Sequence, residues 1–128
     1  MIYTTYFAKL KTLPKDVVPI SICAKAPNGY QGLEYKKLAP SFELLMKWKQ
    51  TQNNDYYIKS YLSQTLQQLE PKEVVMELYD LAATQSTPVK DIALVCYEKS
   101  ADFCHRHLVS AWLHNNGWAS EEYNRRKT

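Results

Sequence analysis

The strongest constraint on the fold is the run Asp91–Tyr97, which reads DIALVCY. A compact apolar run bounded by turn-forming residues predicts a strand that is buried on both faces, as in a parallel sheet. A second run of this kind, DVVPISICA over Asp16–Ala24, predicts another buried strand. We expect Pro19 at the start of that strand, because proline cannot donate to a central ladder.

The segments before, between and after these two runs predict one more strand and four helices, so that strands and helices alternate along the chain. The alternating pattern of Ile2–Phe7 predicts a first strand, and periodic apolar positions predict helices over 40–50, 55–69 and 71–83. A last helix should end at Asn115–Gly117. The order predicts a small single-domain α/β fold, a Rossmann-like sandwich with a largely parallel sheet flanked by helices. We place this domain at 1–118 and a C-terminal tail at 119–128.

The expected helices have defined caps and buried faces. Asp55 is a candidate N-cap of the second helix, and Ser100 or Asp102 is a candidate cap of the last one. The first helix should place Phe42, Leu45, Met46 and Lys49 on one face. The last helix should place Cys104, Leu108, Ala111 and Trp112 on one face.

Composition narrows the class of protein. A chain of 128 residues with a net charge of +3 fits one globular domain, and this charge does not by itself indicate a nucleic-acid partner. The basic cluster NRRKT at the C-terminus leaves nucleic acid as a weakly supported partner. We expect no membrane association, because no apolar run approaches the ~20 residues of a span. The three cysteines are an odd number, so we expect a reduced, cytoplasmic protein.

A candidate site follows from where the strands end. Cys23 and Cys96 close the two buried strands, and Cys104, His105 and Arg106 follow at the start of the last helix. In parallel sheets, ligands bind where strand ends meet helix N-termini. Backbone N–H groups and the planar guanidinium of Arg106 would suit a phosphate or carboxylate. Alternatively, Arg106 pairs with a carboxylate such as Glu98 or Asp102.

Two further readings of this turn concern chemistry. Cys104 could be a nucleophile with His105 as its proton partner and Glu98 as acid or base. However, adjacent helical positions point about 100° apart, and buried cysteine is often an inert core residue. A zinc site from Cys96, Cys104 and His105 is conceivable. Their spacing matches no ordinary close pair of ligands and no fourth ligand is evident, so we expect no metal and no cofactor.

The block IALVCYEKSADFCHRHLVSAWL resembles the signature of the domain-of-unknown-function 488 family, in which a buried strand is followed by Cys-His-Arg. The blocks PISICAKAPNGYQGLEYKKLAPS and DYYIKSYLSQTL are similar to earlier parts of small phage- and bacterium-type members. The resemblance extends over Ile2–Trp118. It implies a compact α/β fold and a site at Cys104, His105 and Arg106 together with Glu98. It implies no particular activity.

The long loop after the second strand should face the Cys-His-Arg turn. Tyr30 and Tyr35 could stack on a ring, and Lys25 or Lys36 could reach a phosphate. Alternatively, both tyrosines merely pin the loop to the body of the domain. We therefore expect a small phosphorylated or nucleotide-like ligand. The alternatives are a cysteine-dependent enzyme that acts on a nucleotide or nucleic-acid base, and a phage-type inhibitor that sequesters a protein or ligand.

Overall fold

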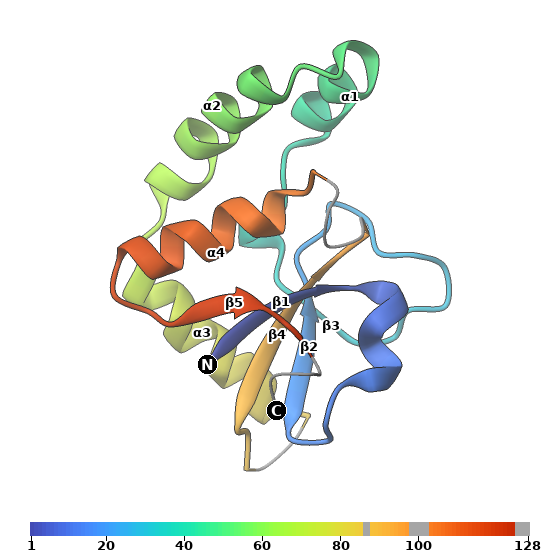
Figure 1. The fold of residues 1–128 in the computed structure, drawn as a ribbon, viewed down its shortest axis with the longest axis vertical. Helices are drawn as coiled ribbons and strands as arrows, with labels where there is room; N and C mark the ends of the chain where they lie inside the picture. Colours follow the sequence, from blue (N-terminus) through green and yellow to red (C-terminus); the bar gives the residue numbers. More distant parts are fainter. Residues whose placement is uncertain (86–87, 98–102, 125–128) are drawn as a thin grey trace.

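The computed structural model describes residues 1–85, 88–97 and 103–124 (Figure 1). In this part of the chain, five parallel strands form one sheet with the order β3-β2-β4-β1-β5. The strands are β1 (Ile2–Tyr6), β2 (Val17–Ser21), β3 (Leu33–Glu34), β4 (Asp91–Cys96) and β5 (Ser120–Glu122). The expected α/β class is confirmed, and every pairing of these strands is parallel.

Strand β4 lies at the centre of the sheet, and all its residues are buried. Successive side chains of a strand point to opposite faces. Ile92, Leu94 and Cys96 therefore share one face, and these three belong to the main hydrophobic core. Ala93 and Val95 point to the other face and are also fully buried. This two-sided burial explains why the sequence of β4 is a continuous apolar run rather than an alternating one.

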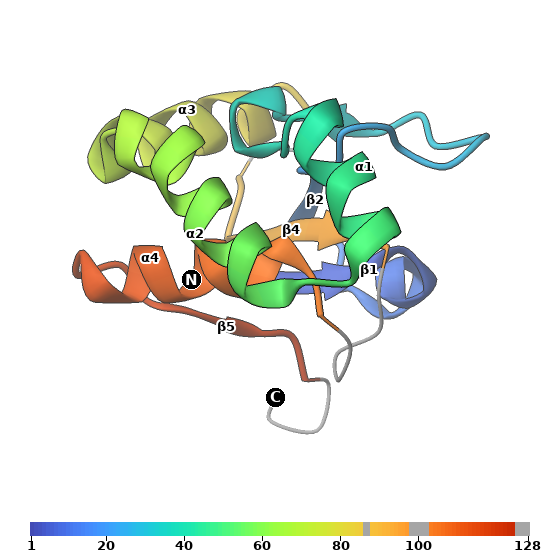
Figure 2. The same cartoon turned by 90° about the horizontal axis from the view of Figure 1, so that it is seen from above.

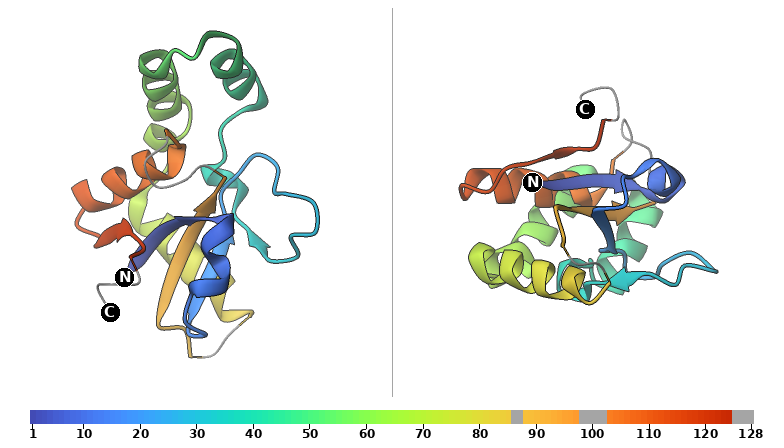
Figure 3. Two further views of the ribbon diagram at one scale, coloured as in Figure 1. Left: turned by 45° about the vertical axis from the view of Figure 1, so that its right-hand side comes forward. Right: turned by 90° about the horizontal axis from the view of Figure 1, so that it is seen from below.

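The helices cover the two faces of the sheet unequally. They are α1 (Phe42–Thr51), α2 (Asn54–Gln64), α3 (Pro71–Ala83) and α4 (His105–Asn115), with short 3-10 helices η1 (Phe7–Thr12), η2 (Lys36–Leu38) and η3 (Leu66–Gln68). Helices α3 and α4 lie on one face, and η1 lies on the other (Figures 2 and 3). Helices α1 and α2 extend beyond the C-terminal ends of the strands (Figure 1). This placement leaves α1, α2 and the start of α4 close to those strand ends.

Local capping explains where two of the helices begin. The Ser41 hydroxyl oxygen accepts a 3.1 Å hydrogen bond from the Leu44 amide at the start of α1. The Asn53 side-chain oxygen accepts a 3.0 Å bond from the Tyr56 amide at the start of α2. Each bond satisfies one of the unpaired N–H groups of a first turn. Asn53 is therefore the cap of α2, and the expectation for Asp55 is wrong.

The buried faces of α1 and α4 differ from those expected. Phe42 is 73% exposed, and Leu44 is instead the buried residue of α1. In α4 the buried residues are His105, Arg106, Val109 and Leu113. Cys104 is the N-cap residue with an extended backbone, so it does not define a helical face. Periodicity failed here because two polar side chains occupy the buried face of α4.

Two other expectations are corrected by the sheet. Residues 119–124 are not a tail, because β5 pairs with β1 at the sheet edge and Tyr123 packs its ring edge-on against Tyr3. Pro19 lies within β2, not before it, and is paired in register with Ala93 of β4. The short β3 pairs only with Ile20 and Ser21, so no ladder reaches Pro19 on that side of β2.

Two further features bear on the expected class of protein. Among the described residues, no helix has the length and apolar character needed to cross a bilayer. Cys23, Cys96 and Cys104 are all free thiols and all buried. None of the three sulfurs is in a disulfide, so each can take part in reactions of a free thiol inside the domain.

Candidate functional site

A pocket of about 430 Å³ opens at the C-terminal ends of β2 and β4. These two strands are neighbours, yet the chain leaves β2 toward β3 and leaves β4 toward β5, in opposite directions across the sheet. Such a switch point is where open parallel sheets bind ligands. The lining residues come from both strand ends, α1, α2 and the start of α4: Cys23, Ala24, Lys25, Pro40, Leu45, Trp48, Lys49, Tyr57, Cys96, Tyr97, Phe103, Cys104 and His105.

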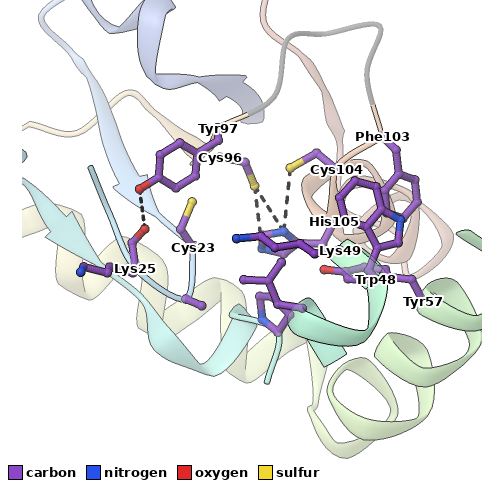
Figure 4. A pocket seen from close by; sticks show the side chains of 13 residues that line it. Cys23, Lys25, Trp48, Lys49, Tyr57, Cys96, Tyr97, Phe103, Cys104 and His105 are labelled. Atoms are coloured by element: carbon purple, nitrogen blue, oxygen red, sulfur yellow. Dashed lines mark hydrogen bonds between the residues drawn. The ribbon is translucent and has the colours of Figure 1, made fainter. Parts of the chain in front are cut away.

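His105 is the polar centre of the pocket floor. Its Nε2 lies 2.7 Å from the carbonyl oxygen of Ile22, which can only accept, so Nε2 carries the hydrogen and donates it. The other ring nitrogen, Nδ1, then faces two sulfurs, at 3.5 Å from Cys96 and 3.8 Å from Cys104 (Figure 4). The edge of the ring packs against Tyr61, at 5.5 Å between centroids. The imidazole is therefore fixed in one orientation, with Nδ1 toward the thiols.

Cys104 combines a helix N-terminus with a cationic neighbour. It is the N-cap of α4, and its extended backbone (φ −156°, ψ 145°) turns the thiol toward the imidazole of the next residue. The objection that neighbouring helical side chains diverge does not apply, because Cys104 precedes the helix. A hydrogen bond from the Cys96 thiol lowers the pKa of Cys104, and His105 lowers it further against the opposing effect of burial. The structure thus favours a thiolate at Cys104.

The pKa values of the two neighbours of this thiolate, His105 and Cys96, are raised rather than lowered. Burial is the largest single influence on His105 and disfavours its cation, but the Cys104 thiolate, the Ile22 carbonyl and Cys23 together outweigh it, so the pKa of His105 is raised. Burial raises the pKa of Cys96 well above the ordinary value, and this thiol remains a donor. The directions of these pKa shifts favour a thiolate at Cys104 paired with an imidazolium at His105, with Cys96 as the neutral thiol beside it.

An aromatic wall faces these groups across the pocket (Figure 4). Trp48 stacks on Phe103 with ring centroids 5.7 Å apart, and Tyr57 meets Phe103 edge-on at 5.1 Å. A 2.7 Å hydrogen bond from the indole nitrogen to the Asn54 side chain fixes the orientation of Trp48. Two lysines, Lys25 and Lys49, add positive charge at the rim. A flat, anionic molecule matches both features.

Comparison with known families identifies the chain. The family model described as the active DUF488-N3 subclade matches residues 3–117, which is most of the sequence. The chain belongs to the DUF488 family. The resemblance expected from the sequence is confirmed, and the match covers β1 to α4. The chain matches no curated protein and no solved structure.

In this DUF488 domain, Arg106 does not face the pocket. Its side chain is fully buried and makes two parallel bonds to Glu122 on β5, from Nε at 3.1 Å and from Nη2 at 3.0 Å. The guanidinium also lies over the Tyr6 ring, at 5.8 Å from its centroid. The structure thus does not support the expectation that Arg106 holds an anion in the pocket. The alternative of a carboxylate pair is the one observed, with Glu122 as the partner.

The remaining expected residues separate into two groups. Cys23, Cys96, Cys104, His105 and Lys25 line the pocket of this DUF488 chain. The loop residues Tyr30, Tyr35 and Lys36 do not line it. Glu98, expected as an acid or base, and Asp102 lie outside the described residues.

The contacts of the three loop residues explain their absence from the pocket. The Tyr30 hydroxyl donates to the Leu33 carbonyl at 2.7 Å, and its ring contacts Phe7. The Tyr35 hydroxyl donates to Glu77, and Lys36 donates to the Ala24 carbonyl at 2.7 Å. The contacts with Phe7 and Glu77 tie both tyrosines to the body of the domain, as in the alternative interpretation of these residues.

Sequence reasoning missed the aromatic wall and Lys49. Trp48, Lys49 and Tyr57 lie on α1 and α2, which were interpreted only as core helices. One available signal was the dense set of aromatic residues in these otherwise polar helices. Their position over the strand ends depends on how α1 and α2 pack, and a helical pattern does not encode that packing.

Proposed function

We propose that this DUF488 domain is a cysteine-dependent enzyme that acts on a small, flat, anionic molecule of the nucleotide class. Cys104 is the nucleophile, and its sulfur forms a bond to an electrophilic carbon of the substrate. His105 stabilises the thiolate. When the bond to the leaving group breaks, that group keeps the electron pair and takes the proton from His105. The observation that carries the proposal is the placement of the Cys104 sulfur at a helix N-terminus, 3.8 Å from Nδ1 of His105, in the wall of the pocket.

The substrate class follows from the remainder of the pocket. Trp48 and Phe103 offer stacking surfaces for a base, and stacking on aromatic side chains tolerates different bases. Lys25 and Lys49 supply charge for a phosphate at the rim; from the sequence we expected this role for Arg106 and for Lys25 or Lys36. A volume of about 430 Å³ lies within the range of small-molecule sites. The name of the matched subclade includes the word active, which agrees with a catalytic role but names no reaction.

A panel of nucleotides, nucleosides and free bases tests the proposal by thermal shift and intact-mass spectrometry. A ligand present at 100 times its Kd adds about 2.7 kcal/mol of stability, which should raise Tm by about 8–13 °C in a domain of this size. Lys49→Ala should reduce the shift. Lys47→Ala is the matched control, because Lys47 lies on the same helix, outside the pocket, and contacts Tyr56. Its shift should equal that of the wild type.

The catalytic part has a separate readout. Wild-type protein should convert the stabilising ligand or carry it as a covalent adduct on Cys104, and Cys104→Ser should bind it without either result. Stable binding with no product and no adduct in the wild type would refute the enzyme and leave a binding protein. Equal shifts in Lys49→Ala and Lys47→Ala, or no stabilising compound in the panel, would refute the pocket as a nucleotide site.

A further inference from the structure

The cluster of Cys96, Cys104 and His105 also has the composition of a metal site. The fold brings one ligand atom of each residue within 4.8 Å of the others, and all three residues are buried. From the sequence these three residues are a conceivable zinc site, but their spacing matches no ordinary pair of ligands, and for that reason we expected no metal. They come together because Cys96 ends β4, while Cys104 and His105 lie at the N-terminus of α4, at the same edge of the sheet.

The two sulfur–nitrogen distances within the cluster match those of a tetrahedral ion. Zinc binds sulfur at about 2.3 Å and nitrogen at about 2.0–2.1 Å, so a tetrahedral site separates its sulfur and nitrogen ligands by about 3.6 Å. The two corresponding distances are 3.5 Å from Cys96 Sγ to His105 Nδ1 and 3.8 Å from Cys104 Sγ to the same nitrogen. Both agree with the tetrahedral value to about 0.2 Å.

The surroundings of His105 are those of a metal ligand. In metal sites the second ring nitrogen of a histidine usually donates to a carbonyl or carboxylate, which fixes the ring and its tautomer. Here Nε2 donates to the Ile22 carbonyl at 2.7 Å, so Nδ1 points at the two sulfurs and offers them its lone pair once it has released its proton. The ring is buried and contacts Tyr61, and both features hold this orientation. The geometry is therefore prepared before any ion binds.

We propose that Cys96 Sγ, Cys104 Sγ and His105 Nδ1 bind one Zn²⁺ ion. Two thiolates and an imidazole favour zinc over Mg²⁺ or Ca²⁺, which prefer oxygen ligands. All three ligands line the pocket, so the fourth coordination position opens to it. Cys23 also borders the pocket, but its thiol donates to the Val95 carbonyl at 3.6 Å and is not one of the three ligands.

Metal binding and the proposed catalysis exclude each other at the same atoms. A Zn²⁺ ion occupies the Nδ1 position that would hold the proton for the departing group, and it draws charge from the Cys104 thiolate, which weakens this sulfur as a nucleophile. The metal site does not depend on the proposed function, because it requires only three ligand atoms in place. If both hold, zinc is an inhibitor and metal-free protein is the catalytic form.

Titration of chelator-treated, reduced protein with Zn²⁺ against a chromophoric chelator tests the site. Wild-type protein should bind one ion per chain, and Co²⁺ in its place should give thiolate-to-metal charge transfer and tetrahedral visible bands. Cys104→Ser keeps a preferred N-cap residue, so it should fold, which circular dichroism can verify. It should weaken binding by more than the 10–100-fold that loss of an outer-sphere partner costs. Cys96→Ser should weaken zinc binding by a similar factor.

Two matched variants provide controls. His114→Ala removes an exposed histidine at the far end of α4, and Cys23→Ser removes the third thiol of the pocket. Both should keep the wild-type stoichiometry and affinity. The inference would be overturned if wild-type protein bound no zinc, if Cys104→Ser bound it as tightly as wild type, or if Cys23→Ser lost as much affinity. Alkylation of Cys104 in metal-free protein tests the catalytic proposal separately, since it can succeed without zinc binding.

Discussion

The buried pair of Arg106 and Glu122 provides a quantitative test of the assignment of Arg106 to the structure of the domain. The guanidinium is fully buried, and the Glu122 carboxylate accepts two bonds from it and a third from the Thr4 hydroxyl at 2.6 Å. Replacing Glu122 with glutamine keeps the side-chain volume but removes the negative charge. A buried cation then remains without its counter-charge, which typically costs 3–5 kcal/mol.

We expect Glu122→Gln to lower the free energy of unfolding by about 3 kcal/mol. The lower end of that range applies because the Glu122 side chain is 25% exposed, so water can partly replace the lost charge. Urea unfolding followed by far-UV circular dichroism measures the change. With a slope of about 1.5–2 kcal/mol per molar urea, the midpoint should fall by about 1.5–2 M and the slope should not change.

An exposed ion pair of the same chain provides the control. Glu34 lies 3.2 Å from Lys36, and both side chains are largely exposed. Glu34→Gln should change stability by less than about 0.5 kcal/mol, because solvent screens such pairs. A loss below 1 kcal/mol in Glu122→Gln, or equal losses in the two variants, would refute the structural role of Arg106.

Further predictions concern Tyr61 and Gln52. Tyr61→Phe should cost about 1–3 kcal/mol in urea unfolding, because it leaves the buried Leu38 carbonyl without the 2.6 Å bond from the phenol. Burial raises the pKa of Tyr61 well above its ordinary value, so stability should fall as pH rises past about 10, where the unfolded chain ionises this phenol and the folded chain does not. Tyr61→Phe should show a smaller loss over that range; an equal loss would contradict the assignment. Gln52→Gly should raise the free energy of unfolding by about 0.5–1 kcal/mol, because Gln52 ends α1 at φ 54°, where glycine is unstrained; an unchanged or lower urea midpoint would contradict this.

The sequence predicted the elements that hydrophobic burial determines. Strand β4 was evident because a strand buried on both faces must be apolar throughout. Helix α3 was evident for a related reason: Val74, Val75, Leu78 and Ala82 repeat at helical spacing and are all buried. In both elements the local pattern and the tertiary environment require the same residues.

Elements that depend on polar partners were not predictable in this way. Strand β5 consists of Ser120, Glu121 and Glu122, which carry no strand pattern. This strand joins the sheet where the Glu122 carboxylate accepts two hydrogen bonds from the guanidinium of Arg106 on α4. The buried face of α4 was misjudged for the same reason, because His105 and Arg106 are buried only through partners that other elements supply.

The position of the candidate site was predictable from the sequence, but the predicted set of lining residues was incomplete. Parallel topology alone indicates that Cys23, Cys96 and Cys104 converge at one edge of the sheet. The aromatic wall of Trp48, Tyr57 and Phe103 requires the packing of α1 and α2 above that edge. The activation of Cys104 likewise depends on its position before the helix, where its side chain can meet that of His105.

Alkylation of native, metal-free protein, with each modified cysteine identified by peptide mass spectrometry, tests the central claim most directly. The account predicts that Cys104 reacts first, ahead of Cys23 and Cys96, and that His105→Gln slows this reaction while circular dichroism stays unchanged. If Cys104 reacted only after the chain had unfolded, or reacted at the same rate without the imidazole, the pocket would not contain an activated nucleophile and the account would be wrong.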